Sequence, residues 1–252
     1  MKETELKEFI LMLAIESGKI IRSYFRNEIS IEFKADSSPV TIADKKAEEI
    51  MREMIMKNYP EHGIIGEEFG IHNPDAEYQW VLDPIDGTKS FVCGTVTFGT
   101  LIALMKNGEP VLGAINQPIL SEFLLGDNST AMLNGSFVNV RPCDTLADAV
   151  LLTTDHRNIA KYQNAEKFDK LISSVELYRN WGDCYGYYLL ATGYADIMID
   201  PIMSQWDLMA LIPIIRGAGG IITDYQGNDP VKGKSIIAAS PGIHGEVIKI
   251  LN

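Results

Sequence analysis

The sequence contains few cysteines and histidines, and their spacing fits neither a set of disulfides nor a zinc site. Its three cysteines, Cys93, Cys143 and Cys184, are odd in number and scattered along the chain. Its four histidines also lack the spacing of metal ligands. We therefore expect neither a disulfide framework nor a zinc site, and we expect a reducing, cytoplasmic setting.

Features of membrane proteins and nucleic-acid-binding proteins are missing as well. No apolar run is long enough to span a bilayer, and the first five residues are too acidic for a signal peptide. Asp and Glu number 34 against 22 Lys and Arg, and the resulting net charge of −12 argues against a non-specific nucleic-acid surface. The expected partner is a small molecule.

The remaining composition is that of an ordinary globular protein, with 46% hydrophobic and 22% charged residues among 252. No linker rich in Pro, Gly or Ser divides the chain, and no repeat is visible. We expect residues 1–252 to form one compact unit with ample core. Within it we expect an N-terminal lobe over residues 1–144 and a C-terminal lobe over residues 145–252.

The two lobes differ in their apolar patterns, which predict a mixed α and β fold rather than a simple Rossmann winding. The first lobe has two helical segments followed by an antiparallel run of strands, with hairpin turns at Asn107-Gly108 and Asn134-Gly135. In the second lobe, strands and helices alternate. The predicted helices cover residues 6–25, 43–58, 159–173, 185–192, 206–216 and the C-terminus. The predicted strands cover residues 29–33, 62–68, 80–82, 97–105, 111–117, 122–125, 131–133, 149–153, 175–179, 196–199, 221–224 and 236–239, and residues 35–40 are expected to form a loop.

Residues 80–88, with the sequence Trp-Val-Leu-Asp-Pro-Ile-Asp-Gly-Thr, carry the strongest chemical signal. A buried strand ends there in a turn that presents Asp83 and Asp86, followed by Gly87 and Thr88. Carboxylate oxygens suit Mg²⁺, and exposed backbone N–H groups suit phosphoryl oxygens. Since a protein this acidic needs cations near a phosphate ester, the stretch predicts a metal and phosphate site.

Three further acids, Asp44, Glu67 and Asp207, sit where a strand ends or a helix begins. Each has a simpler interpretation. Asp44 and Asp207 could be first-turn carboxylates favoured by the helix dipole, and Glu67 with Glu68 could be a solvated strand end. None of the three identifies a site by itself.

A different phosphatase family has a motif of similar sequence. Haloacid-dehalogenase phosphatases carry Asp-x-Asp-Gly-Thr, in which aspartates two residues apart share one face of a strand. Asp83 and Asp86 are three residues apart, Pro84 interrupts the strand, and the motif lies in the middle of the chain. We therefore reject that interpretation.

Several motifs, in their order along the chain, resemble the inositol monophosphatase-like family of metal-dependent phosphatases. They are Gly66-Glu67-Glu68, the stretch 80–88, Gln205-Trp206-Asp207 leading into residues 216–220, and the loop from Lys34 to Asp44. The resemblance covers almost the whole chain. It implies an αβαβα layered sugar-phosphatase fold and, as in most relatives, a homodimer.

The resemblance also implies roles for individual residues. Glu67, Asp83 and the carbonyl of Ile85 would hold a first Mg²⁺, and Asp83, Asp86 and Asp207 would hold a second. A weaker third ion would sit near Glu67, and Lys34 is placed where the family loop often carries a basic residue. Closely spaced ions can clamp the attacking and leaving oxygens of an in-line displacement. Thr88 and Asp44 match the pair that orients and deprotonates the attacking water, with Glu67 beside them as a catalytic acid. The backbone N–H groups of Gly87 and Thr88 would bind phosphate, and no covalent phospho-enzyme is implied.

Selectivity is expected to come from the second lobe, where Asp183 adds a charge at a position that is small or hydroxylic in inositol-type relatives. Asp200 aligns with a family acid that contacts the polar end of the substrate. Two carboxylates there favour an ammonium over a neutral polyol. Residues 181–187 and 86–91 resemble the histidinol-phosphate phosphatase branch, although Asp183 could also be a helix cap. The role of residues 154–158 stays open.

The sequence thus predicts a Mg²⁺-dependent phosphomonoesterase that acts on L-histidinol phosphate. One alternative is the same chemistry on inositol 1-phosphate or on another sugar or nucleotide phosphate. A second alternative, a non-catalytic regulatory protein on this fold, is disfavoured because every expected ligand is present.

Overall fold

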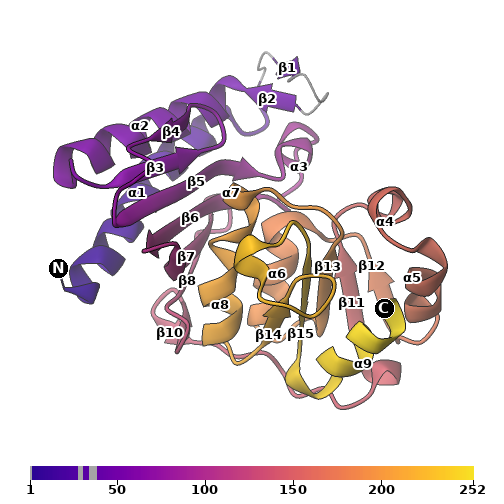
Figure 1. Cartoon of the computed structure of the whole chain (residues 1–252). Coiled ribbons are helices and arrows are strands. Elements are labelled where there is room, and N and C mark those ends of the chain that lie inside the picture. The colour runs from indigo at the N-terminus through magenta and orange to yellow at the C-terminus, as the bar shows by residue number, and fades with distance from the viewer. Residues whose placement is uncertain (1, 28–30, 34–38) are drawn as a thin grey trace.

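The computed structural model describes residues 2–27, 31–33 and 39–252. These residues form five layers in which helices and sheets alternate (Figure 1). Helices α1 and α2 cover one face of the first sheet, α6, α7 and α8 lie between the two sheets, and α4, α5 and α9 cover the second sheet. This arrangement confirms the predicted αβαβα fold.

The first sheet comes from the N-terminal part of the chain. Of the described strands, eight form it in the order β10-β9-β8-β7-β6-β5-β3-β4, with β3 and β5 parallel and the other neighbours antiparallel. The elements of this part are α1 (Glu3–Tyr24), β1 (Ile31–Phe33), β2 (Pro39–Thr41), α2 (Ile42–Asn58), β3 (Gly63–Gly66), β4 (Gly70–His72), β5 (Tyr78–Asp86), α3 (Thr88–Val92), β6 (Gly99–Lys106), β7 (Glu109–Gln117), β8 (Glu122–Gly126), β9 (Ala131–Leu133) and β10 (Ser136–Phe137).

The second sheet comes from the C-terminal part. Five described strands form it in the order β12-β11-β13-β15-β14, with β11 parallel to both of its neighbours and β15 antiparallel to both of its own. The elements of this part are η1 (Leu146–Asp148), β11 (Val150–Thr153), α4 (His156–Tyr162), α5 (Ala165–Ile172), β12 (Leu177–Arg179), α6 (Asp183–Ala191), β13 (Ile197–Asp200), α7 (Gln205–Leu208), α8 (Leu211–Gly217), β14 (Ile221–Thr223), η2 (Pro230–Lys232), β15 (Ile236–Ala239) and α9 (Pro241–Leu251).

Both predicted hairpin turns are confirmed. At Asn107-Gly108 and at Asn134-Gly135, the two turn residues have positive φ, between 48° and 84°. Asn and Gly adopt this region more readily than other residues, and a turn with two positive φ values matches the twist of the strands on either side. The order of strands in this half of the first sheet therefore follows from local sequence.

Two predicted helices are each divided in two, which corrects the sequence interpretation. Residues 159–173 form α4 and α5 because the side chain of Asn164 accepts a hydrogen bond from the N–H of Lys167 at 3.0 Å and starts a new helix there. Residues 206–216 form α7 and α8. Pro213 lies in the first turn of α8, where its missing N–H is tolerated, whereas it would break a continuous helix.

The N-terminal strand predictions also need correction. Residues 31–33 form β1, whereas residues 29 and 30 lie outside the described part of the chain. In the predicted loop, residues 39 and 40 belong to β2, and residues 35–38 lie outside the described part. Strand β4, at one edge of the first sheet, was not predicted; it is three residues long and fully exposed, so it has no apolar alternation to detect.

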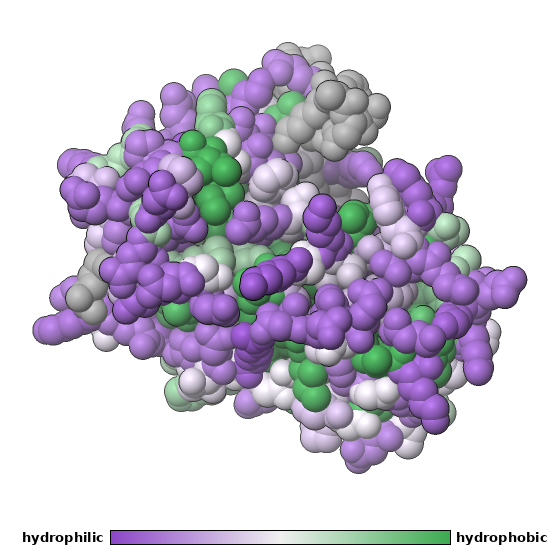
Figure 2. Space-filling view, viewed as in Figure 1, coloured by the Kyte–Doolittle hydropathy of each residue, from purple (hydrophilic) through white to green (hydrophobic). Residues whose placement is uncertain are grey.

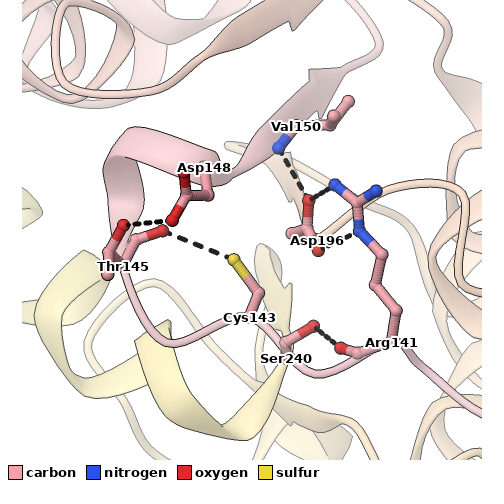
Figure 3. Close-up of polar contacts among 7 residues, drawn as sticks. All are labelled: Arg141, Cys143, Thr145, Asp148, Val150, Asp196 and Ser240. Carbon is pink, nitrogen blue, oxygen red and sulfur yellow. Dashed lines mark hydrogen bonds and ion pairs between the residues drawn. The ribbon is translucent and has the colours of Figure 1, made fainter.

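Arg141, in the segment that connects the two sheets, binds Asp196, which is fully buried and directly precedes Ile197, the first residue of β13 in the second sheet. Figure 3 shows these contacts. Both nitrogens of a guanidinium edge of Arg141 bind the carboxylate of Asp196, and the N–H of Val150 donates to it at 2.7 Å. Ser240 adds a hydrogen bond to the carbonyl of Arg141 at 2.9 Å. Charge-assisted bidentate contacts of this kind fix orientation as well as distance.

The face of the molecule in Figure 2 is mostly hydrophilic, with small, separated hydrophobic areas. Among the residues that the structure describes, no helix has the length and apolar character needed to cross a membrane.

Candidate active site

A β-bulge at the end of β5 places two aspartates on the same side of the strand. Asp83 pairs with Leu101 of β6, and Asp86 pairs with Gly99, so three steps along β5 match two steps along β6. The hydroxyl of Thr100 donates to the carbonyl of Pro84 at 2.9 Å, which satisfies a backbone group inside the bulge. One extra residue thus lets carboxylates three positions apart point to one site.

The two aspartates meet Asp207 of α7 in a compact carboxylate cluster. Among the described residues, carboxylate oxygens of Asp83, Asp86 and Asp207 lie within 4.8 Å of one another. Asp83 is 2% exposed, and its Oδ1 atom has no hydrogen-bond partner in the described part of the chain. Burial and then the neighbouring carboxylates raise the pKa of Asp83 well above its usual value. A buried cluster of like charges with an unpartnered oxygen fits a bound cation with oxygen ligands.

Glu67 lies next to this cluster because β3 and β5 are parallel neighbours. Gly66 is in register with Leu82, and the N–H of Glu67 donates to the carbonyl of Leu82 at 3.2 Å. After burial, the charge of Glu67 is the largest contribution that raises the pKa of Asp83. The remaining predicted ligand, the carbonyl of Ile85, accepts a hydrogen bond from the Thr88 hydroxyl at 3.0 Å.

Asp44 and Thr88 come together as the motifs predicted. Asp44 is the third residue of α2, and its Oδ2 atom accepts hydrogen bonds from the N–H and the hydroxyl of Thr41, at 2.8 and 2.6 Å. Its Oδ1 atom faces the Thr88 hydroxyl at 3.4 Å. Burial raises the pKa of Asp44 to about 6, although the Thr41 hydrogen bonds act in the opposite direction. A carboxyl poised near neutral pH can exchange a proton in this range.

Helices α2, α6 and α7 begin at the site, and the start of each makes polar contacts there. Asp207 forms a capping box in α7 by accepting the N–H of Ser204 at 2.9 Å, as Asp44 does in α2. At the start of α6, the N–H of Cys184 donates to Asp86. The two interpretations of Asp44 and Asp207 are therefore compatible: each is a helix-start carboxylate and also faces the site. Burial raises the pKa of Asp207 to about 6.

Asp183 is the first residue of α6, and its carboxylate faces the first lobe. Its φ of 50° lies in the left-handed region, which is uncommon for a residue other than Gly. The hydroxyl of Ser90 donates to its Oδ2 atom at 3.1 Å. A Cβ on Gly87 would lie 2.8 Å from that same oxygen, so only glycine leaves room for this approach. At the start of α6, the N–H of Cys184, which a capping side chain would accept, donates to the carboxylate of Asp86 instead of to Asp183.

Asp200, at the end of β13, is held by two donors. The N–H of Thr154 reaches its Oδ1 at 3.2 Å, and the hydroxyl of Tyr187 reaches its Oδ2 at 2.9 Å. The side chain is 5% exposed, and burial raises its pKa to about 7. The hydroxyl of Thr154 also accepts the N–H of Asp183 at 2.9 Å, so one threonine positions both carboxylates.

Two adjoining cavities lie over this cluster. The larger has a volume of about 470 Å³ and is lined by Glu67, Gly87, Thr88, Asp183 and Asp207 among the predicted residues. The smaller, of about 90 Å³, is lined by Asp86, Asp183, Asp200 and Asp207. The volume of the larger cavity suits a small organic phosphate.

Sequence reasoning missed several residues of the cavity wall and left others open. Lys89 and Ser90 line the larger cavity; the sequence places them in the segment 86–91 that resembles the histidinol-phosphate phosphatase branch, but it gives them no role in the site. Thr154, Asp155 and Asn158 also line it, which places the undecided segment 154–158 at the rim. Lys34 lies outside the described residues.

Comparison with known proteins agrees with this geometry. The sequence profile of the inositol monophosphatase family matches residues 2–252. The chain is 46% identical over 234 residues to the bifunctional phosphatase IMPL2, chloroplastic, of Arabidopsis thaliana, covering 90% of this chain and 67% of that protein. It is 38% identical over 236 residues to a histidinol-phosphatase of Chlorobaculum parvum, covering 92% of this chain and 91% of that protein.

A solved structure shows the same relationship in three dimensions. An inositol monophosphatase from Zymomonas mobilis superposes with a TM-score of 0.88 at 38% sequence identity, covering 100% of this chain and 99% of the other. With the family profile spanning nearly every residue and the acidic cluster in place, the chain belongs to the inositol monophosphatase family, whose members are phosphatases that hydrolyse phosphate monoesters.

Proposed function

We propose that this protein is a Mg²⁺-dependent phosphomonoesterase whose substrate is L-histidinol phosphate. The observation that carries the substrate proposal is the placement of Asp183 and Asp200. Both carboxylates line the smaller cavity beside the acidic cluster. The bond broken would be the phosphate ester, with water as the nucleophile and inorganic phosphate and the free alcohol as products.

The metal sites follow from the carboxylate cluster. We assign Glu67, Asp83 and the Ile85 carbonyl to one Mg²⁺, and Asp83, Asp86 and Asp207 to a second. The unpartnered Oδ1 of Asp83 and the short separations among the three aspartates support Asp83 as the bridging ligand. When bound, Mg²⁺ lowers the pKa of an attacking water and offsets charge on the leaving oxygen.

The protein's own groups then orient the reaction. The Thr88 hydroxyl, held between the Ile85 carbonyl and Asp44, is placed to hold the attacking water, and Asp44 is placed to accept its proton. We assign the backbone N–H groups of Gly87 and Thr88 to the phosphate. The left-handed φ of 88° at Gly87 turns the chain there.

The charge balance of the cavity favours a cationic leaving group. Two Mg²⁺ ions carry four positive charges, which match the four carboxylates of Glu67, Asp83, Asp86 and Asp207. Asp155, Asp183 and Asp200 are then left among the acids that line the cavities, and Lys89 is the cationic side chain among the described residues that line the larger cavity. An ammonium group on the substrate would pair with these acids, whereas a neutral polyol would leave them unpaired. L-Histidinol phosphate carries such an ammonium group beside an imidazole.

Inositol 1-phosphate is the second candidate, because an inositol monophosphatase structure matches this chain over its whole length. The proposal of a histidinol-phosphate phosphatase also includes the assignment of residues 1–144 to metal binding, with Asp207 as a further ligand from the second lobe, and of residues 145–252 to selectivity. It includes the homodimer and the cytoplasmic setting expected from the sequence as well.

The test is phosphate release with Mg²⁺ from histidinol phosphate, inositol 1-phosphate, fructose 1,6-bisphosphate and adenosine 3′,5′-bisphosphate. A strong preference for histidinol phosphate would place the protein in histidine biosynthesis. A preference for inositol phosphate, or a flat profile, would retain the metal site and reject the assignment of Asp183 to an ammonium. No release from any of the four would favour the regulatory alternative.

A further inference from the structure

A buried carboxylate outside the predicted site supports the turn that carries Glu67. Glu48 lies on α2 one helical turn after Asp44, and its side chain is fully buried. Its Oε2 atom accepts the N–H of Glu68 at 2.7 Å, and its Oε1 atom accepts the N–H of Phe69 at 3.2 Å. The N–H groups of the two residues that follow Glu67 therefore both donate to the Glu48 side chain.

Arg52 completes this support from the next turn of α2. Its Nη1 atom donates to Oε1 of Glu48 at 3.1 Å, and its two Nη atoms donate to the carbonyl of Gly70 at 3.0 and 3.1 Å. Asp44, Glu48 and Arg52 are spaced by four residues, so they form one stripe on the helix. Within this stripe, Glu48 and Arg52 face the segment from Gly66 to Gly70.

The Glu48 carboxylate lies so close to the backbone of residue 66 that only a glycine fits there. A Cβ on Gly66 would overlap Oε1 of Glu48, so no larger residue fits there without displacing the carboxylate. On the other side, the N–H of Glu67 is tied to Leu82 of β5. The backbone of Glu67 is therefore held between β5, which accepts its own N–H, and Glu48, which accepts the N–H groups of the next two residues.

We propose that Glu48, supported by Arg52, is a positioning residue that fixes Glu67 as a metal ligand and thereby sets the affinity of the site for Mg²⁺. This inference rests on the proposed metal site. Glu48 lines neither of the two cavities and is not among the assigned ligands. It acts through the backbone of residues 68 and 69, as outer contacts of metal ligands do in other metalloproteins.

The test variant is Glu48→Gln. A glutamine keeps the size of the side chain but offers a single acceptor oxygen, and it turns an NH₂ group toward a backbone N–H or Arg52. The matched control is Glu49→Gln, which removes the same charge from the exposed neighbour on α2. Mg²⁺ binding is measured on the metal-depleted full chain by calorimetric titration, and the Tm of each variant is recorded with and without Mg²⁺.

We expect the dissociation constant for Mg²⁺ to rise about 10- to 100-fold in Glu48→Gln and to stay unchanged in Glu49→Gln. The Mg²⁺-induced rise in Tm should shrink in Glu48→Gln. Equal losses of Tm with and without Mg²⁺, at an unchanged dissociation constant, would mean that Glu48 is only structural and would overturn the proposal.

If Glu48→Gln does not fold, Arg52→Lys provides the second variant, since lysine keeps the charge but cannot contact both Glu48 and the Gly70 carbonyl with a planar fork. It should weaken Mg²⁺ binding several-fold, and wild-type binding would overturn the proposal. Because binding is read without turnover, a wild-type protein that binds Mg²⁺ but releases no phosphate would reject the proposed function and leave this inference standing.

Discussion

The Ser90 hydroxyl donates a hydrogen bond to Oδ2 of Asp183 at 3.1 Å, across 93 positions of sequence. Ser90 lies in α3, directly after the 80–88 motif, and Asp183 is the first residue of α6 in the other half of the chain. The hydroxyl of Thr97 donates in turn to Ser90 at 3.2 Å. The orientation of the Asp183 carboxylate, which lines both cavities, therefore depends directly on the segment that follows the 80–88 motif.

Replacing Asp183 tests whether that carboxylate pairs with a cation. Asp183→Asn keeps the shape and tolerates the left-handed φ of 50° at this position. A hydrogen bond to a charged group contributes about 1.5–3 kcal/mol, so the KM for histidinol phosphate should rise about 10- to 100-fold. The KM for inositol 1-phosphate should change little. Steady-state kinetics on both substrates measure the difference.

Ser90→Ala should shift the two KM values in the same unequal way, by a smaller factor, because the carboxylate keeps its charge and loses only its orientation. Equal effects on both substrates in Asp183→Asn would show that Asp183 is structural.

Thr88 and Asp44 can be tested apart from metal binding. Thr88→Val removes the hydroxyl that contacts Asp44 at 3.4 Å without changing the size of the side chain. If this pair deprotonates the water, kcat should fall about 10²- to 10⁴-fold, with Mg²⁺ affinity within a few-fold of wild type. Thr88→Ser, which retains the hydroxyl, is the control and should recover most of the rate. A Thr88→Val enzyme with wild-type kcat would exclude the pair from proton transfer.

Local sequence predicted those parts of the fold that depend on neighbouring residues. The hairpins at Asn107-Gly108 and Asn134-Gly135 follow from turn chemistry, and α1 follows from the spacing of its apolar residues. The divisions at Asn164 and before Pro213 also had local signals, since Asn favours caps and Pro disrupts helix interiors. The prediction gave more weight to the apolar periodicity, which continues across both breaks.

The site likewise combines features that local sequence predicts with features that depend on tertiary contacts. The acids at the end of β5 were recognisable because the motif lies within nine consecutive residues, but the bulge that aligns Asp83 with Asp86 depends on pairing with β6. The contacts of Thr154, Ser90 and Glu48 join residues that are 20 or more positions apart. No periodicity in the sequence reports such contacts, because tertiary packing creates them.

Gly87 should be irreplaceable for two separable reasons. It has a φ of 88°, and a Cβ there would also meet Asp183 Oδ2 at 2.8 Å and the Thr97 carbonyl at 3.0 Å. Gly108 is the matched control, since it has a φ of 83° and a Cβ there would meet nothing within 4 Å in the described part of the chain. Gly108→Ala should cost about 1 kcal/mol from backbone strain, or about 2–4 °C in Tm.

Gly87→Ala should lower the Tm at least twice as far and should also raise the KM, because Asp183 or the Thr97 backbone must move. Thermal denaturation and kinetics of the two variants give the comparison. Similar Tm losses with unchanged KM would mean that strain alone explains the glycine.

Asp83 makes the metal-free protein sensitive to pH in a defined direction. Burial and the charges of Glu67, Asp86 and Asp207 raise its folded-state pKa, and the pKa values of Asp44 and Asp207 rise to about 6. Groups whose pKa is higher in the folded than in the unfolded state bind protons more tightly when folded. The contribution of these groups to the free energy of unfolding is therefore fully present below their unfolded pKa of about 3.9 and is lost as the pH rises through their folded-state pKa values. Without Mg²⁺, the Tm should fall between about pH 5 and pH 8, and saturating Mg²⁺ should reduce that fall.

Asp83→Asn removes the most crowded of these charges. At pH 8 without Mg²⁺, we expect the variant to be more stable than wild type by about 1 kcal/mol, or about 2–4 °C in Tm. The same variant should lose Mg²⁺-dependent turnover and most of the Mg²⁺-induced rise in Tm, because the negative charge and the second carboxylate oxygen are gone. Near-wild-type turnover would refute the bridging role. A metal-free variant less stable than wild type at pH 8 would refute the account of the pKa shifts as repulsion among buried carboxylates, since that repulsion is what the substitution relieves.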